Sequence, residues 1–286
     1  MNKILILGSH SFVSKGLVSE LDSLSYYVHE FSRGKKRRQD NKIYGNYLSI
    51  SSNELFDNSY DIVINFAILK DQSLDDNIQF IKDLIDFCKS HGVKKLIHFS
   101  SIMVYNYALK DVTENTEIEH LDYTIKNGYG KIKIAVDQFL MENKDNLPFE
   151  LIIVRPGYVL ADNRPCPFIK RLPFGCFIIK GNMKSKQPVV RREDIHKALI
   201  RIIETEKNLP IYHFFPNDGM TKYRYAKQIE NGTVLIMPKC IFKYIPFLLS
   251  KIGIIPKSLY SRFEGMYIES NFSSVMTENK LNIQFK

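Results

Sequence analysis

The sequence predicts a doubly wound α/β fold, in which helices cover both faces of a parallel sheet, with a smaller C-terminal lobe. Short apolar runs alternate with segments of helical periodicity over the first half of the chain, as in repeated β-α-β units. Such units cross over right-handed and place helices on both faces of one sheet. The 286 residues, 44% of them hydrophobic and 25% charged, suffice for one large domain with a lobe.

Each expected element follows from its own residues. Lys3–Gly8 is a continuous apolar run that ends in glycine, as expected of a buried parallel strand. Phe12–Leu24 has apolar residues at helical spacing, and Asn77–Ser90 has an apolar helical face. The other expected elements are strands at Tyr26–Arg33, Asp61–Ala67, Lys95–Ser101, Glu150–Gly157 and Ile211–Phe215, and helices at Gly128–Asn143 and Arg192–Glu206.

Beyond Gly157 the alternation weakens, while proline, glycine and basic residues increase. We therefore expect residues 1–160 with 190–215 to form the doubly wound domain. Residues 161–189 with 216–286 should form the smaller lobe over the carboxyl ends of the strands. The segment 241–256 is apolar but interrupted by two lysines and two prolines. We interpret it as a packed helix or lid of the lobe, with a membrane-surface helix as the alternative.

Composition excludes several functional classes. The four cysteines are widely spaced, without a CxxC pair or a histidine cluster, so we expect reduced thiols, no metal site and a cytoplasmic location. No apolar stretch reaches 18 residues, so no transmembrane segment is expected. The net charge is +9, but no zinc-finger or RNA-binding motif accompanies it, so nucleic acid is not an expected partner.

The turn after the first strand is the first segment that carries chemistry. A glycine-rich turn that opens a helix lets backbone N–H groups hold a pyrophosphate. Here Gly8 stands at the strand exit, and Ser11 and Ser14 occupy the places where further glycines are expected. Serine is small and also donates to phosphate. An ordinary strand-to-helix turn is the alternative.

A run of five cations follows the second strand: Arg33, Lys35, Lys36, Arg37 and Arg38. The end of this strand meets the adenosine ribose of a dinucleotide in doubly wound folds, where an acid binds the 2′-hydroxyl and an arginine accommodates a 2′-phosphate. With Arg33 and no acid at the strand end, NADP(H) is favoured over NAD(H). A solubilising loop is the alternative.

Ser101, Tyr129 and Lys133 form the third candidate site. Tyr-x-x-x-Lys alone means little, and Tyr223–Lys227 is a second match. Tyr129 and Lys133, however, share one face of an expected helix, and Ser101 ends a central strand, where ligands bind in such sheets. A lysine cation favours the phenolate of a neighbouring tyrosine and suits it to acid/base catalysis, while a serine hydroxyl polarises a carbonyl.

Together these segments resemble the extended short-chain dehydrogenase/reductase family, the NAD(P)-dependent epimerase/dehydratase group that acts on nucleotide sugars. The resemblance covers nearly the whole chain and implies a Rossmann domain. The matching segments are Gly8–Ser14 (GxxGFxG with serine for two glycines), Asn65–Ala67, Asn77, Phe99–Asn106 (SSxxVYG with asparagine for the last glycine), Tyr129–Lys133 (YxxxK), Arg155–Gly157 (RPG) and Arg192–Ile195.

The resemblance implies that Tyr129 is the acid/base, that Ser101 is its hydrogen-bonding partner and that Lys133 also holds the nicotinamide ribose. The dinucleotide would then contact Gly8, Ser11, Phe12, Val13, Arg33, Phe66, Ala67, Tyr129, Lys133 and Pro156. Ser101 and Tyr129 would also contact a nucleotide-sugar substrate. Many relatives bind its diphosphate through an arginine where this chain has Gln187, so we expect Lys184, Lys186 and Arg191 to compensate.

The implied activity is oxidoreduction at a nucleotide-sugar carbon in surface-polysaccharide biosynthesis. We place 4-keto reduction first, because it consumes free NADPH, which the basic run suits. A 4-epimerase is the alternative, and a non-catalytic NADP(H)-sensing protein is a second one. A dehydratase is less favoured, because dehydratase relatives usually have Asp-Glu where this chain has Ile102-Met103. A homodimer stays open.

Overall fold

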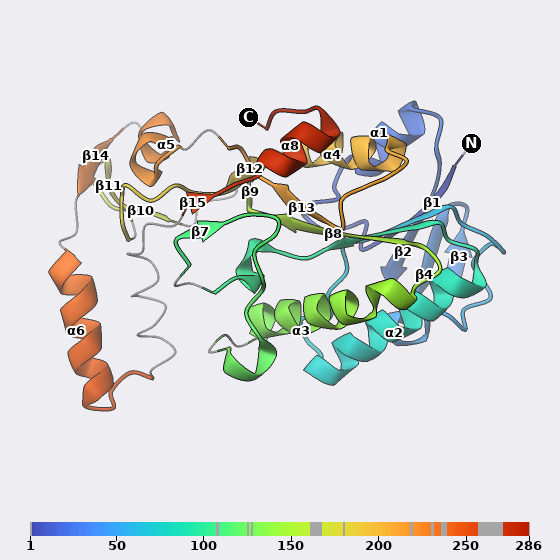
Figure 1. Cartoon of the computed structure of the whole chain (residues 1–286), viewed down its shortest axis with the longest axis horizontal. Helices are drawn as coiled ribbons and strands as arrows, with labels where there is room; N and C mark the ends of the chain where they lie inside the picture. The colour runs from blue at the N-terminus through green and yellow to red at the C-terminus, as the bar shows by residue number, and fades with distance from the viewer. Residues whose placement is uncertain are drawn as a thin grey trace.

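A computed structural model describes residues 2–106, 109–124, 126, 128–160, 168–179, 181–217, 220–229, 232–235, 239–256 and 271–285. Its main sheet has eight strands in the order β13-β8-β6-β5-β1-β2-β4-β3 (Figure 1). All neighbours pair parallel except β3 and β4. The strands are β1 (Lys3–Leu7), β2 (Tyr27–Arg33), β3 (Arg37–Gln39), β4 (Lys42–Gly45), β5 (Ile62–Asn65), β6 (Lys95–Phe99), β8 (Glu150–Pro156) and β13 (Ile211–Phe214).

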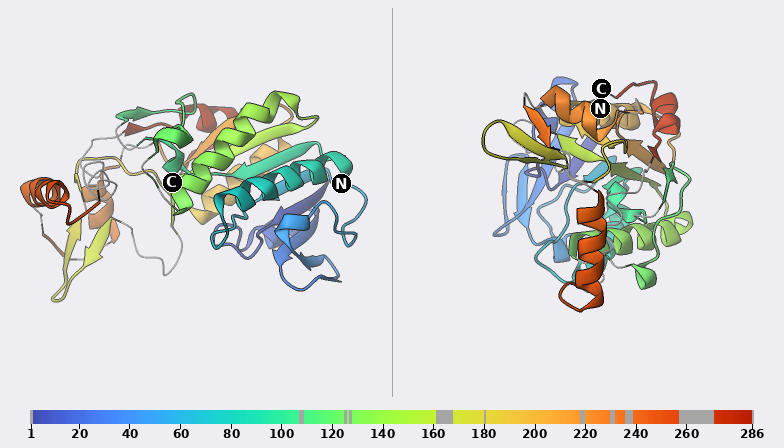
Figure 2. Two further views of the ribbon diagram at one scale, coloured as in Figure 1. Left: turned by 90° about the horizontal axis from the view of Figure 1, so that it is seen from below. Right: turned by 90° about the vertical axis from the view of Figure 1, so that its left-hand side faces the viewer.

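Helices cover both faces of this sheet (Figures 1 and 2). Ile4 and Ile6 of β1 pack with the helices α1 (Leu17–Ser23), α4 (Arg192–Glu204) and α8 (Val275–Leu281). Leu5 and Leu7 point to the other face and pack with α2 (Leu74–Ser90) and α3 (Gly128–Asn143). Because successive side chains of a strand alternate between faces, two buried faces require the continuous apolar runs seen in the sequence. The predicted doubly wound fold is confirmed.

The helix predicted over Phe12–Leu24 is wrong in its first turn. Residues 9–16 form successive turns, and α1 begins only at Leu17. The Ser14 hydroxyl donates to the carbonyls of Gly8 and Ser9 at 2.9 and 2.8 Å, which competes with helical hydrogen bonds. Gly16 then adopts a left-handed φ of 95°, which interrupts the helical backbone.

Other boundaries differ less. The helix α3 has the predicted bounds, whereas α2 begins three residues before the predicted Asn77 because Ser73 and Asp76 form a capping box. Arg37 and Arg38, at the end of the cation run, lie in β3, which forms an unpredicted hairpin with β4. Short 3-10 helices complete this part of the chain: η1 (Tyr47–Ser49), η2 (Ile102–Val104), η3 (Leu121–Tyr123) and η4 (Lys144–Asn146).

A smaller sheet lies beyond the carboxyl end of β8 (Figure 1). It consists of β10 (Ile169–Arg171), β11 (Cys176–Ile179) and β14 (Thr233–Leu235), with α5 (Lys222–Ile229) packed on β11. The parallel pair β9 (Tyr158–Leu160) and β12 (Val189–Arg191) connects it to β8 and α4. Gly157 permits this connection, since a Cβ there would lie 2.1 Å from the Pro188 carbonyl oxygen.

The C-terminal segment does not pack where the sequence placed it. We expected residues 216–286 in the smaller lobe, but Leu281 and Phe285 belong to the core around β1 and α4. The strand β15 (Asn271–Phe272) also pairs with β7 (Asp111–Val112). The helix α6 (Lys239–Lys251) stands apart at the far end of the molecule (Figure 1). Among the described residues, no helix is both long and apolar enough to cross a bilayer.

Candidate active site

The turn after β1 lies against the end of β5. Gly8 has a φ of 76°, and a Cβ at this position would lie 3.0 Å from the Ala67 nitrogen and 3.2 Å from the Phe66 carbonyl carbon. Only glycine fits this backbone and this approach. The structure therefore brings together Gly8, Phe66 and Ala67, three of the residues predicted to bind a dinucleotide.

Ser11 and Ser14 stabilise the turn after β1 through hydrogen bonds of their side chains within the turn. Their hydroxyls lie 2.8 Å apart, and the Ser14 side chain is buried. The turn is also fixed from α4: His196 Nε2 donates to the Val13 carbonyl at 2.9 Å, and its Nδ1 lies 2.7 Å from the Glu20 carboxylate. His196 was not among the predicted site residues, because a single histidine on a predicted helix gives no sign of such a contact.

The end of β2 joins the same turn. The Ser32 hydroxyl lies 3.3 Å from that of Ser9, and Arg33 forms an exposed ion pair of 3.7 Å with Asp71. Three of the other cations of the run have separate partners. Lys36 pairs with Glu54 at 2.6 Å, Arg37 lies 4.5 Å from the Tyr44 ring centroid, and Arg38 pairs with Asp57 at 2.5 Å.

Tyr129 and Lys133 occupy the first two turns of α3. Tyr129 is 37% exposed, whereas Lys133 is buried and donates from Nζ to the Phe99 carbonyl at the end of β6. The Lys133 ammonium lies 5.8 Å from the Tyr129 ring centroid, and Lys70 brings a second ammonium to 5.6 Å. The predicted tyrosine–lysine pair therefore forms, with the tyrosine accessible and the lysine enclosed.

The environment of Lys133 changes its acidity. Burial lowers the pKa of Lys133 from 10.5 to about 8; Asp137, one turn further along α3, raises it, and Lys70 lowers it. Lys133 is thus still mostly cationic near neutral pH. A buried cation beside a phenol favours the phenolate, which is the electrostatic requirement for a tyrosine acid/base.

Ser101 lies at the start of η2, which packs against α3. Its backbone is extended, and its hydroxyl accepts a hydrogen bond from the Met103 nitrogen at 3.2 Å. The Met103 side chain in turn reaches Gly130, the residue after Tyr129. The structure thus places Ser101 at the carboxyl edge of β6, beside the first turn of α3.

A buried ion pair supports this corner. Arg155 donates to both oxygens of Asp137, at 3.1 Å from Nε and 2.7 Å from Nη2, and Ser100 donates to the same carboxylate at 2.5 Å. Asp137 is also the residue that raises the pKa of Lys133. The RPG motif revealed Arg155 in the sequence, but nothing there revealed its partner.

The ion pair continues into a hydrogen-bonded chain. Arg155 Nη1 donates to the Tyr105 hydroxyl at 2.7 Å, Tyr105 donates to Nε2 of His213 at 2.6 Å, and the histidine donates from Nδ1 to the Ser273 carbonyl at 2.8 Å. Burial lowers the pKa of His213 from 6.5 to about 3; the bond to Ser273 raises it, and Arg155 lowers it. His213 is therefore neutral in the folded protein, and its imidazole joins Tyr105 to the Ser273 carbonyl.

His98 of β6 lies next to Lys133, since both residues line one small cavity. Its Nδ1 accepts from the Asn65 amide at 3.1 Å, so Nε2 carries the hydrogen, and this atom has no hydrogen-bond partner among the described residues. A cavity of about 10 Å³, lined by His98, Lys133 and Ala67 among others, has the volume that one water molecule needs.

The remaining predicted residues lie around this edge. Pro156 ends β8 and is buried, and Phe12 packs on the core beside α1. Lys184, Lys186 and Arg191 are all exposed on the connection between the smaller sheet and α4. Their contact with a substrate diphosphate stays a prediction.

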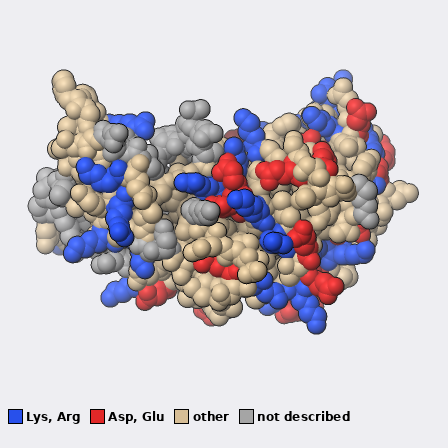
Figure 3. All heavy atoms as spheres, turned by 90° about the horizontal axis from the view of Figure 1, so that it is seen from above, with Lys and Arg blue, Asp and Glu red and all other residues tan. Residues whose placement is uncertain are grey.

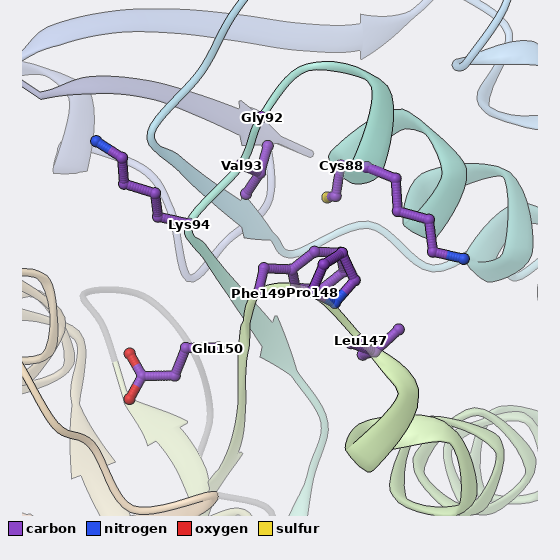
Figure 4. A pocket seen from close by; sticks show the side chains of 9 residues that line it. Cys88, Gly92, Val93, Lys94, Leu147, Pro148, Phe149 and Glu150 are labelled. Carbon is purple, nitrogen blue, oxygen red and sulfur yellow. The ribbon is translucent and has the colours of Figure 1, made fainter.

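A separate pocket of about 570 Å³ lies at the opposite ends of the strands (Figure 4). Its lining includes Cys88 near the end of α2, and Lys94, Phe149 and Glu150 at the amino ends of β6 and β8. Because ligands of doubly wound sheets bind at the carboxyl ends, this pocket is not the candidate site.

Residues 4–212 match the model of the NAD dependent epimerase/dehydratase family. The chain belongs to that family. The match spans the turn after β1, Tyr129, Lys133 and most of the main sheet. A search of curated proteins found no match.

Solved structures share the fold of this family member at low sequence identity. A short-chain dehydrogenase/reductase superfamily protein from Agrobacterium tumefaciens with bound NAD has a TM-score of 0.72 and 12% identity, over 99% of this chain and 92% of that one. UDP-N-acetylglucosamine 4-epimerase from Bacillus cereus has a TM-score of 0.70 and 15% identity, over 100% of this chain and 94% of that one. The human epimerase family protein SDR39U1 with NADPH has a TM-score of 0.66 and 14% identity, over 99% of this chain and 95% of that one.

Proposed function

We propose that this protein transfers hydride between NADP(H) and C4 of a nucleotide-activated sugar, reducing a 4-keto group in surface-polysaccharide biosynthesis. The observation that carries the proposal is the buried Lys133 ammonium beside the accessible Tyr129, at the carboxyl edge of the sheet. Membership of the epimerase/dehydratase family supports hydride chemistry on a nicotinamide cofactor. The fold shared with a UDP-sugar epimerase is consistent with a nucleotide-sugar substrate.

In this proposal Tyr129 donates its phenolic proton to the sugar carbonyl oxygen as hydride reaches the carbon. Bound NADPH supplies that hydride. Lys133 stabilises the phenolate left behind, and the Ser101 hydroxyl donates a hydrogen bond to the same carbonyl oxygen. Because Lys133 has a pKa of about 8, its cationic form is available at neutral pH. The phenolate then regains a proton from solvent.

The experiment for this assignment is the Tyr129→Phe variant. It keeps the ring and removes the proton, so kcat should fall at least about 10²-fold, as expected for loss of a positioned acid/base. Tyr223→Phe is the matched control, because it changes the second Tyr-x-x-x-Lys pair, which lies on α5. Near-normal turnover of Tyr129→Phe would refute the assignment.

The turn residues Gly8, Ser11, Phe12 and Val13, with Phe66, Ala67 and Pro156, would line the dinucleotide in this proposal. Arg33 would exchange its exposed pair with Asp71 for a 2′-phosphate. A charge-assisted hydrogen bond contributes about 1.5–3 kcal/mol, or roughly ten- to a hundredfold in affinity.

Calorimetric titration with NADPH and NADH tests this cofactor choice. Arg33→Ala should remove most of the NADPH preference and leave NADH binding nearly unchanged. Arg37→Ala is the control, because Arg37 already lies over Tyr44. Equal affinities of the wild type for both cofactors would count against Arg33 and favour the alternative, a 4-epimerase with retained NAD.

The lobe cations Lys184, Lys186 and Arg191 would bind the substrate diphosphate. All three are exposed, so replacing them with glutamine should leave the fold intact. We expect the triple variant to raise the substrate KM with little change in kcat. The lost contacts would bind the diphosphate equally in the ground state and in the transition state. An unchanged KM would remove these residues from the site.

A further inference from the structure

The helical arm, defined here as residues 239–256, turns an apolar face to solvent. It comprises α6 and the following turn and stands apart from the main sheet (Figures 1 and 2). Tyr244, Ile245, Leu248 and Ile252 share one helical face and are 50–67% exposed. Pro246, on the other side of the helix, is buried. This orientation is the reverse of an ordinary surface helix, whose apolar stripe faces the core.

The turn after α6 extends the apolar face. Gly253 has a φ of 77°, its nitrogen donates to the Ser250 carbonyl at 3.2 Å, and the Ile254 nitrogen donates to the Leu249 carbonyl at 2.9 Å. This pattern is a Schellman motif, which ends a helix in a defined geometry. It leaves Ile254 65% exposed beside the helical face. The hydrogen bonds of this turn therefore fix the backbone that presents Ile254 beside the helical face.

The charge of the chain is concentrated in the same part of the molecule. The described residues of this part of the chain, 168–179, 181–189, 216–217, 220–229, 232–235 and 239–256, contain ten basic residues and no acidic one. Three of these ten basic residues, Lys239, Lys243 and Lys251, belong to α6. Figure 3 shows more blue than red at the left-hand end of the molecule, where this lobe lies. A partner for the arm must therefore be both apolar and negatively charged.

We propose that the arm docks on the surface of an anionic phospholipid bilayer. The 13 residues of α6 extend about 20 Å, which is too short to span a bilayer of about 30 Å, so the helix lies in the headgroup plane. Leu248 and Ile252 enter the acyl boundary, and Lys251 and the other lobe cations meet lipid phosphates. The main sheet stays in water, with its carboxyl edge toward the membrane side.

The first test measures partition onto vesicles of phosphatidylcholine, with and without 30% phosphatidylglycerol, by co-sedimentation. The wild type should bind the anionic vesicles at least tenfold more strongly than the neutral ones. Leu248→Glu with Ile252→Glu should lower that binding at least tenfold, whereas Leu24→Glu, at an exposed leucine after α1, should not. Circular dichroism checks that each variant stays folded.

A second measurement reports the position of the arm directly. The chain has no tryptophan, so Leu248→Trp introduces a single fluorophore. Its emission should shift to shorter wavelength on anionic vesicles, and that of Leu24→Trp should not. Absence of wild-type binding, or binding that the Leu248 and Ile252 changes leave intact, would overturn the proposal. A dimer that dissociates in the double variant, without vesicle binding, would show that a second copy covers the arm.

Discussion

Acid should destabilise this fold through His213, and replacing the imidazole by an amide should remove that effect. In the neutral tautomer, His213 accepts from Tyr105 at 2.6 Å and donates to the Ser273 carbonyl at 2.8 Å. A proton on Nε2 would leave the Tyr105 hydroxyl without its acceptor and place a cation near Arg155. A glutamine supplies one acceptor and one donor but does not titrate. His213→Gln is therefore the informative change.

The magnitude follows from the two pKa values. His213 titrates at about 3 in the folded protein, against 6.5 without the fold. The unfolded chain therefore binds the proton first, so this contribution is complete above pH 6.5 and is lost as the pH falls toward 3. The loss is about 1.4 kcal/mol per pH unit, or about 2 kcal/mol at pH 5. Net stabilities of about 5–15 kcal/mol make such a loss measurable.

Urea unfolding between pH 8 and pH 4.5 is the assay. At pH 8 we expect His213→Gln to be less stable than the wild type by about 1 kcal/mol, because the amide reproduces the two hydrogen bonds imperfectly. Below pH 6 its free energy of unfolding should fall less steeply, by about 1.4 kcal/mol per pH unit, so the two curves cross near pH 5.8. Parallel curves for the two proteins would refute the reasoning.

Three further changes test other parts of the site. Asp137→Asn should lower the free energy of unfolding by about 3–5 kcal/mol in urea, because it leaves the buried Arg155 guanidinium without a charged partner. Gly8→Ala should weaken NADPH binding at least tenfold in calorimetry, because the added Cβ would lie 3.0 Å from the Ala67 nitrogen; Gly92→Ala, where nothing lies within 4 Å, should not. Lys70→Gln should move the alkaline limb of kcat/KM for reduction upward, because it removes a cation that lowers the pKa of Lys133 and lies 5.6 Å from the Tyr129 ring centroid. Lys70→Arg should leave that limb in place, and a downward shift with Lys70→Gln would contradict the electrostatic assignment.

The central sheet was predictable because its strands are buried on both faces. Runs such as Lys3–Leu7 and Ile62–Asn65 have apolar side chains in both directions, and this pattern occurs in few other structures. The helix over Gly128–Asn143 was predicted with its observed bounds. The motifs also indicated that Tyr129 and Lys133 would share a helical face. Their catalytic roles remain predictions.

The features that were missed depend on single hydrogen bonds rather than on periodicity. Ser14 bonds to carbonyls of its own turn and so shortens α1, and no apolar pattern records such a bond. Asp137 and His213 are 76 residues apart in the sequence, and only the fold joins them through Arg155 and Tyr105. The packing of Leu281 on the main core was missed because it is an apolar contact with residues far away in the sequence. Long-range contacts of individual residues leave no periodic signal in one sequence.

Transfer of deuterium from NADPH labelled at C4 tests the proposed reduction most directly. The labelled cofactor is incubated with UDP-, GDP- and dTDP-activated 4-keto sugars, and the products are analysed by mass spectrometry. The wild type should place one deuterium on the sugar of one substrate at C4, and Tyr129→Phe should place at least about 10²-fold less in the same time. Interconversion of the corresponding 4-hydroxy nucleotide sugars, incubated in parallel, without deuterium uptake would contradict net reduction and show an epimerase instead. Tight NADPH binding without turnover of any of these substrates would contradict catalysis by this site.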